Sequence, residues 1–307
     1  MSINSQNVLD YPNNNTIFMV WNFKEGIDIK ESFKSLCTLI SNLNNSALTR
    51  FPNAKASVVL GIGFEAWHLL QLPTPVPKEF ETFTPIAGTK HTAVATRGDL
   101  HLHIRSDAYS FCIDAAAAIS DTLKAVAVNI QEVHGFRYWD SRSILGFVDG
   151  TENPHGEDRA YFGIIGDEDP NYKGGSYLFV QKYLHDLQAW KALPVNEQEK
   201  VIGRSKTDDI EMPDNVKPSN AHSALANVGD DFKIVRDNMP FGNVASNEMG
   251  TYFIAYASSF LTVKKMLTNM FVGVPEGNYD RILDFSTPQT GTLFFVPTFE
   301  MLDSFAG

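Results

Sequence analysis

The order in which strand-like and helix-like segments follow one another restricts the fold of this chain most strongly. Alternating, β-branched and aromatic runs predict strands at 16–23, 55–63, 99–106 and 129–139, and amphipathic periodicity predicts helices at 27–43 and 107–126. The order strand–helix–strand–strand–helix–strand is ferredoxin-like. It recurs in the second half, with strands expected at 175–184, 231–237, 250–259 and 290–297 and helices at 195–202 and 260–271. We therefore expect an α+β fold of two ferredoxin-like units whose antiparallel sheets pack together, as in a dimeric α+β barrel.

This duplication divides the chain into three parts. Residues 1–15 are rich in Asn and Ser and are expected to form a flexible N-terminal tail, followed by one unit at 16–145 and a second at 146–307. A long polar segment, 204–230, interrupts the second unit. Insertions of this length without regular structure usually serve a site or are disordered, and this one contains His222.

Composition excludes several classes of protein. Lys and Arg number 25 against 36 Asp and Glu, and the net charge of −11 disfavours nucleic-acid binding. No apolar run reaches the roughly 18–20 residues that span a bilayer, and the N-terminus does not resemble a secretory signal, so we expect no membrane insertion. Two cysteines, Cys37 and Cys112, provide no disulfide framework. A cytoplasmic protein is expected.

Two short segments stand out for their polar residues. In 146–154, GFVDGTENP, two glycines bracket Asp149, and glycine permits turns that present a carboxylate to a ligand. An ordinary Asp-Gly turn explains the same residues. In 234–242, Arg236 ends an apolar strand, where an inward guanidinium would need a partner and an outward one would pair with a surface acid. The residues alone leave both pairs of alternatives open.

Histidines raise the question of a metal site. His101 and His103 are two apart on a predicted strand, so both point to one face, as a two-histidine metal site requires. No third ligand stands nearby in the sequence, and histidines on a half-exposed strand are common. His222 is distinguished from the others by its long polar segment.

The motifs together carry a resemblance. GFVDGTENP (146–154), GGSY (174–177), IGRSK (202–206), His222, VRDNMPFG (235–242) and LDFSTPQTG (283–291) occur in this order in dye-decolourising peroxidases. The chain resembles the compact bacterial-type members that lack a secretion signal, closely over 140–300 and in length and element order before that. Members of this family have two ferredoxin-like units and bind haem.

The resemblance implies a non-covalent haem b in the second unit. His222 is then the axial ligand of the haem iron, and Asp284 the carboxylate that accepts the imidazole N–H and raises its basicity. Arg204 resembles a residue that pairs with a haem propionate, which suits a guanidinium. Phe253 resembles an aromatic side chain over the distal haem face.

On the distal side, the resemblance implies that Asp149 moves a proton between the oxygens of hydrogen peroxide. Arg236 would stabilise the developing negative charge, and Asn238 stands where some members have Ser. The expected enzyme is a haem peroxidase that oxidises dyes, phenols or other small one-electron donors, and relatives commonly form homo-oligomers. Two alternatives stay open: a haem-binding or iron-handling protein without physiological peroxide turnover, and a non-haem metalloprotein built on His101 and His103.

Overall fold

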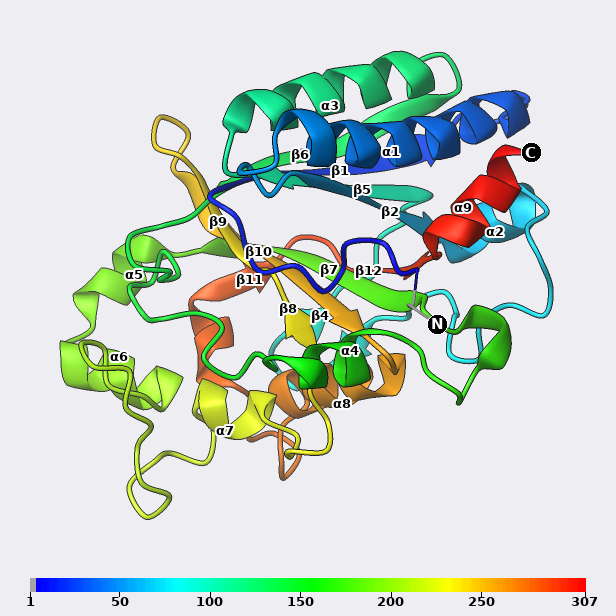
Figure 1. The fold of residues 1–307 in the computed structure, drawn as a ribbon. Coiled ribbons are helices and arrows are strands. Elements are labelled where there is room, and N and C mark those ends of the chain that lie inside the picture. Colours follow the sequence, from blue (N-terminus) through cyan, green and yellow to red (C-terminus); the bar gives the residue numbers. More distant parts are fainter. Residues whose placement is uncertain (1–3) are drawn as a thin grey trace.

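The strands of the computed structural model, which describes residues 4–307, form one large antiparallel sheet (Figure 1). Its order is β11-β7-β12-β2-β5-β1-β6-β9-β10-β8, and β7 also pairs with β10. A separate two-stranded sheet joins β3 (Ile86–Ala87) to β4 (Thr92–Ala93). The strands of the large sheet are β1 (Asn15–Phe23), β2 (Ser57–Gly63), β5 (Leu100–Ser106), β6 (Ala127–Phe136), β7 (Ser176–His185), β8 (Val235–Arg236), β9 (Met239–Asn243), β10 (Glu248–Ala257), β11 (Ser286–Pro288) and β12 (Thr292–Val296).

The two halves of the chain repeat one spatial strand order. The first half contributes β2-β5-β1-β6, and the second half, read in the same direction, contributes β9-β10-β7-β12, so the expected duplication of a ferredoxin-like unit is confirmed. The halves also join edge to edge. β12 pairs with β2, and β6 pairs with β9 through Gly135 and Phe241. Since β7 pairs with β10, eight strands close on themselves as a barrel within one chain, which leaves few exposed strand edges.

Helices cover the outside of this barrel (Figure 1). α1 and α3 pack on the strands of the first unit, and α8 packs against β7 and β10 of the second. Among residues 4–307, no helix has the length and apolar character needed to cross a membrane. The helices are α1 (Lys30–Arg50), α2 (Phe64–Leu69), α3 (Tyr109–Leu123), α4 (Glu157–Gly163), η1 (Pro170–Tyr172), α5 (Leu187–Ala192), α6 (Val195–Ile202), α7 (His222–Ala226), α8 (Phe260–Phe271), η2 (Arg281–Asp284) and α9 (Phe299–Ala306).

Alternation along β10 separates two environments. Tyr252 and Tyr256 are fully buried among apolar side chains inside the barrel. Thr251 and Phe253 point to the other face, where α8 covers the sheet. Successive side chains of a strand point to opposite faces, so one strand serves both the barrel core and the cavity described below.

The expectation of a loose N-terminal tail is wrong for residues 4–14; residues 1–3 lie outside the described part of the chain. Gln6 is 2 % exposed, and its amide donates to the carbonyls of Leu60 and Pro297 and accepts from the Leu60 N–H. Val8 is also buried. The polar composition of this segment does not predict its burial. Gln6 can be buried because backbone groups of both units satisfy its amide.

A second correction concerns the strand expected at 231–237. Only Val235–Arg236 forms a strand there (β8), and β9 takes the expected position beside β10. Pro240 has no N–H to donate, so its position argues against a central strand. The strand β9 nevertheless forms there, because it pairs along its length with β10 and at a single position with β6. The boundary expected at 145 falls in the segment between β6 and β7 and stays a prediction.

Candidate functional site

A cavity lies between the outer face of β7 and β10 and the helices α7 and α8. Its volume is about 140 Å³, and a second cavity of about 120 Å³ adjoins it and shares residues of its wall. The polar side chains that reach the first cavity include Asp149, His222, Arg236 and Asn238. Most of the wall is apolar: Leu145, Phe147, Ile202, Phe253, Val263, Met266, Leu267, Met270 and Ile282.

His222 opens the short helix α7 and is held by a buried carboxylate. Its Nδ1 lies 2.7 Å from Oδ2 of Asp280, which is fully buried. The other carboxylate oxygen, Oδ1, accepts the N–H of Ile282 at 3.0 Å and caps η2. The carboxylate accepts a hydrogen bond from Nδ1, so the imidazole proton lies on Nδ1. The lone pair of Nε2 is then available to bind a metal ion.

The carboxylate that contacts His222 is therefore Asp280, and the expectation of Asp284 in that role is wrong. Oδ1 of Asp284 instead accepts from Lys90 at 2.6 Å and Tyr279 at 3.1 Å and lies 3.1 Å from His91 Nε2. Partial burial alone would raise the pKa of Asp284, but these hydrogen bonds outweigh it and lower the pKa. Asp280 is the extended N-cap residue that precedes η2 and Asp284 is the last residue of η2, and the two carboxylates have different partners.

Asp149, Asn238 and Arg236 come together at another part of the same cavity. The Asn238 amide donates to both carboxylate oxygens of Asp149, at 3.2 and 3.4 Å, and its carbonyl accepts the N–H of Ile254 at 3.1 Å. Within residues 4–307, the Arg236 guanidinium makes no hydrogen bond and no ion pair within 4 Å. Its donors are thus free for a ligand in the cavity.

Asn153 joins the two segments that carry these side chains. Its amide donates to the Arg236 carbonyl at 2.8 Å, and its carbonyl accepts the Arg236 N–H at 2.9 Å. Gly150, at φ +88°, provides the turn that precedes it. Asn153 lies within the motif at 146–154, but no sequence pattern distinguishes it from the other residues of that motif.

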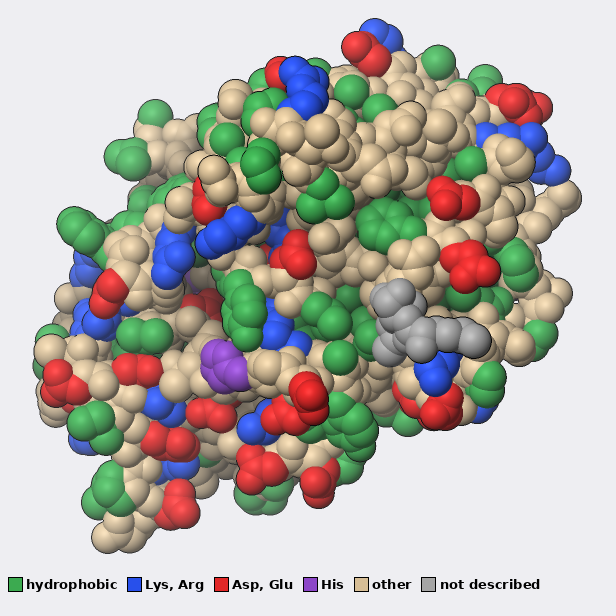
Figure 2. Space-filling model, in the orientation of Figure 1, with side chains coloured by type: hydrophobic (Ala, Val, Ile, Leu, Met, Phe, Trp, Pro, Cys, Tyr) green, Lys and Arg blue, Asp and Glu red, His purple; other side chains and the backbone are tan. Residues whose placement is uncertain are grey.

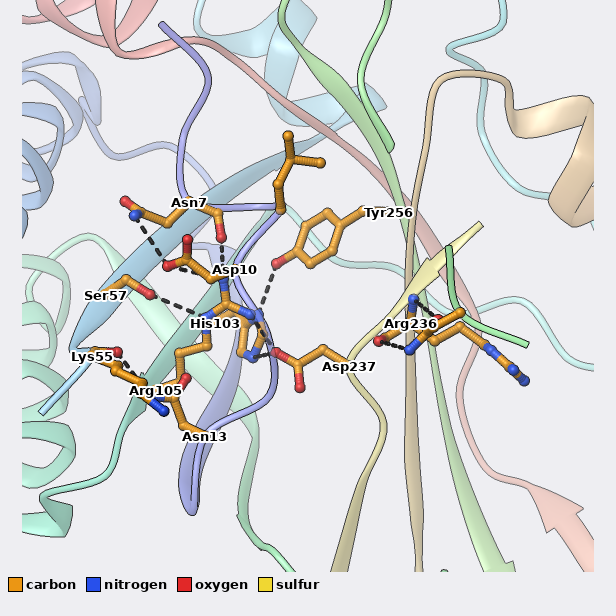
Figure 3. A network of polar contacts seen from close by, with 12 residues as sticks. Asn7, Asp10, Asn13, Lys55, Ser57, His103, Arg105, Arg236, Asp237 and Tyr256 are labelled. Carbon is orange, nitrogen blue, oxygen red and sulfur yellow. Dashed lines mark hydrogen bonds and ion pairs between the residues drawn. The ribbon is translucent and has the colours of Figure 1, made fainter. Parts of the chain in front are cut away.

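Asp237 fixes the same segment from inside the barrel (Figure 3). Its carboxylate pairs with Arg105 of β5, and the two side chains are 1 % and 0 % exposed. Arg105 also donates to Ser57 Oγ at 3.0 Å and to the Asn7 carbonyl. The side chain of Arg236 extends away from this pair. A buried ion pair therefore anchors the residue between Arg236 and Asn238.

The remaining expected residues fall in different places. Phe253 lines the first cavity, and Arg204 lines the adjoining one together with His222. Arg204 lies 2.8 Å from Asp209, 3.6 Å from Glu152 and 3.5 Å from Glu211. The positions of Phe253 and Arg204 are compatible with the implied roles, which stay predictions.

His101 and His103 face the barrel interior. His101 Nε2 lies 3.2 Å from the Tyr252 hydroxyl, and His103 Nδ1 lies 2.8 Å from that of Tyr256. Burial lowers the pKa of His101 to about 3, so its imidazole stays neutral. In the described part of the chain, no group of three or more His, Cys, Asp or Glu side chains is arranged to hold a metal ion.

Known proteins similar to this chain in sequence and structure belong to one family. The family model for Dyp-type peroxidase, N-terminal, matches residues 6–137, and that for Dyp-type peroxidase, C-terminal, matches 140–301. A dye-decolorizing peroxidase of Rhodococcus erythropolis is 49 % identical over 292 residues, which cover 94 % of this chain and 84 % of that protein. The crystal structure of a dye-decolorizing peroxidase from Bacteroides thetaiotaomicron matches with a TM-score of 0.97 at 48 % identity, covering 100 % and 99 % of the two chains. A DypB variant of Rhodococcus jostii in complex with heme matches with a TM-score of 0.91 at 42 % identity, covering 98 % of each.

Proposed function

Because the chain belongs to the dye-decolourising peroxidase family, we propose that it binds haem b beside His222 and uses Asp149, Arg236 and Asn238 to reduce hydrogen peroxide. One observation carries this proposal. A single cavity is reached by an imidazole backed by a buried carboxylate, by a carboxylate held by an amide, and by a guanidinium without a partner in residues 4–307. These are the groups that an axial ligand and a peroxide-cleaving site require.

The residues of the cavity suit haem. Its wall is largely apolar, as a porphyrin ring needs, and His222 offers Nε2 as an axial ligand. Arg204, in the adjoining cavity, would exchange its present acidic partners for a propionate. Cys37 and Cys112 are buried in the core packed by α1 and α3 and line neither the His222 cavity nor the one that adjoins it, which supports non-covalent binding.

In the proposed mechanism, bound haem supplies the iron that exchanges electrons with hydrogen peroxide and with the donor. The Asp149 carboxylate takes a proton from one peroxide oxygen and delivers it to the other, so that water leaves. Asn238 holds both oxygens of this carboxylate through its amide. Arg236 is more than 4 Å from Asp149, so its free donors act on the negative charge that develops on the departing oxygen.

The competing proposal is a haem-binding or iron-handling protein that uses the same cavity without peroxide turnover. Both proposals need His222, but only the peroxidase needs Asp149 and Arg236. Asp149→Ala and Arg236→Leu are therefore assayed for peroxide-dependent dye oxidation, with haem occupancy measured in each preparation. We expect full occupancy and a loss of about 100-fold or more in rate. Full rates in both variants would refute the peroxidase mechanism. Asp121→Ala, which removes an exposed carboxylate paired with Lys124, is the matched control.

The reducing substrates, the oligomeric state and the cellular compartment are also proposed. We propose dyes, phenols and other small one-electron donors as reducing substrates, and a homo-oligomer in the cytoplasm. Both cysteines are free and buried, which suits a reducing compartment. Size-exclusion chromatography with light scattering tests the oligomeric state; a purely monomeric protein would contradict that part.

A further inference from the structure

A third cavity, outside the His222 cavity, opens beside the N-terminal segment. Its volume is about 260 Å³, and it lies among residues 11–13, the segment 137–155 and the start of β9. It meets the His222 cavity at Asp149, Arg236 and Asn238, which line both. Figure 2 shows a hollow on this face with Lys and Arg side chains gathered around it, next to a histidine.

This third cavity is electropositive although the chain carries a net charge of −11. Four arginines line it, and Asp149 is the one carboxylate in its wall among residues 4–307. Arg142 is paired with Asp140 at 2.8 Å. Within residues 4–307, no carboxylate lies within 4 Å of the other three guanidinium groups, those of Arg137, Arg159 and Arg236. Arg159 is buried, and its hydrogen-bond partners in the same residues are all backbone carbonyls. Clustered guanidinium groups without counterions favour an anionic ligand.

Aromatic side chains form another part of the wall. The ring of Tyr11 is stacked on His155 with centroids 6.3 Å apart, and the Arg159 guanidinium lies 4.4 Å from the Tyr11 centroid. Tyr138 also lines the cavity. Flat rings and guanidinium planes are the surfaces on which an aromatic ligand stacks.

We propose that this third cavity binds the reducing substrate, and that the preferred substrate is a single-ring phenol that carries a carboxylate. The inference rests on the proposed peroxidase function and names the donor class. The carboxylate is recognised by Arg137, and the phenol hydroxyl reaches the end of the cavity formed by Asp149 and Asn238. Each phenol gives up one electron and one proton. Two phenols thus reduce one hydrogen peroxide to two waters and become two phenoxyl radicals, with Asp149 as the group that accepts the phenol proton.

Binding is measured by calorimetry on the haem-loaded protein without peroxide, so the result does not depend on turnover. The probes share one ring and differ in charge: 3-(4-hydroxyphenyl)propionate is an anion, 4-ethylphenol is neutral and tyramine is a cation. We expect the anion to bind about three- to tenfold more tightly than the neutral phenol and the cation to bind most weakly. Raising KCl from about 0.1 M to about 1 M shortens the Debye length from about 10 Å to about 3 Å and should weaken only the preference for the anion.

The site is located by Arg137→Gln. Arg137 is exposed, so the fold tolerates the change, and we expect the preference for the anion to disappear while 4-ethylphenol binding changes less than about twofold. Arg50→Gln removes the same charge from an exposed position at the end of α1 and should keep the preference. An anion that binds no more tightly than the neutral phenol, or a preference that survives Arg137→Gln, overturns the inference. Peroxide turnover with 4-ethylphenol, measured separately, shows whether the proposed function itself has failed.

Discussion

Replacing Asp280 with Asn should change the redox properties of the bound haem through His222. Both carboxylate oxygens of Asp280 are in use: Oδ2 accepts from His222 Nδ1 at 2.7 Å and Oδ1 from the Ile282 N–H at 3.0 Å. An asparagine has one acceptor oxygen and cannot serve both donors. Since the side chain is fully buried, water cannot replace the lost bond, and the imidazole loses its negative partner.

The size of this effect follows from the strength of the lost bond. A hydrogen bond to a charged group contributes about 1.5–3 kcal/mol, and about 1.4 kcal/mol corresponds to about 59 mV for one electron. A carboxylate behind the imidazole stabilises the more oxidised iron, so its removal should raise the reduction potential by about 60–130 mV. Spectroelectrochemical titration of the haem-loaded variant measures this shift directly.

Asp284→Asn is the matched control. It removes the same charge four residues along the chain, but Asp284 contacts Lys90, His91 and Tyr279 rather than His222. We expect its potential to change by less than about 20 mV, since no hydrogen bond to the ligand is lost. A shift in Asp284→Asn that equals or exceeds the one in Asp280→Asn would refute the assignment of Asp280 as the partner of His222.

Three further predictions concern stability and haem retention. The lowered pKa of Asp284 means that its ionised form stabilises the fold above pH 3.8 and that this contribution is lost as pH falls through the lowered pKa. Asp284→Asn should therefore lower the free energy of unfolding, measured with urea, by about 1 kcal/mol at pH 7 and by progressively less as the pH falls below 3.8. Asp237→Asn should cost about 3 kcal/mol, because the buried Arg105 charge keeps only the partly exposed Asp10 carboxylate, 3.6 Å away. Asp121→Asn at the exposed pair with Lys124 should cost less than about 1 kcal/mol, and equal urea midpoints would contradict the role of the buried pair. His222→Ala should abolish or strongly weaken haem retention in a gel-filtered preparation, and an unchanged haem-to-protein ratio would remove His222 as the axial ligand.

Much of the fold could be predicted because both units have regular hydrophobic periodicity. The strands around Phe18 and Leu178 are short, almost continuous runs of apolar residues that are buried on both faces. The helices α1 and α8 place most of their buried residues three or four apart. Edge pairing between the units could not be predicted, since it depends on strand neighbours far apart in the chain. Gln6 shows the same limit: nothing local reveals that a polar residue near the N-terminus is bonded to Leu60 and Pro297.

The candidate site was predictable to the extent that its residues lie in short motifs. Asp149, Arg236, Asn238 and His222 were selected from the sequence and its resemblance, and the structure places all four at one cavity. Asp280 was missed because two acids stand four residues apart, and only the geometry of η2 decides which one faces the imidazole.

Two other contributors to the site carry no sequence signal of their own. The Asn153 side chain is hydrogen-bonded to the backbone of Arg236, 83 positions away. The Asp237 carboxylate is paired with Arg105, 132 positions away. Contacts at such separations follow from the barrel closure and not from local spacing.

The central claim is that this cavity holds a haem ligated by His222 and open to peroxide beside Asp149 and Arg236. The most direct measurement is the absorption spectrum of the protein supplied with haem, recorded before and after one equivalent of hydrogen peroxide. We predict a Soret band that shifts rapidly on addition of peroxide in the wild type and much more slowly in Arg236→Leu. The absence of a Soret band, or a spectrum that peroxide leaves unchanged in the wild type, would contradict the claim.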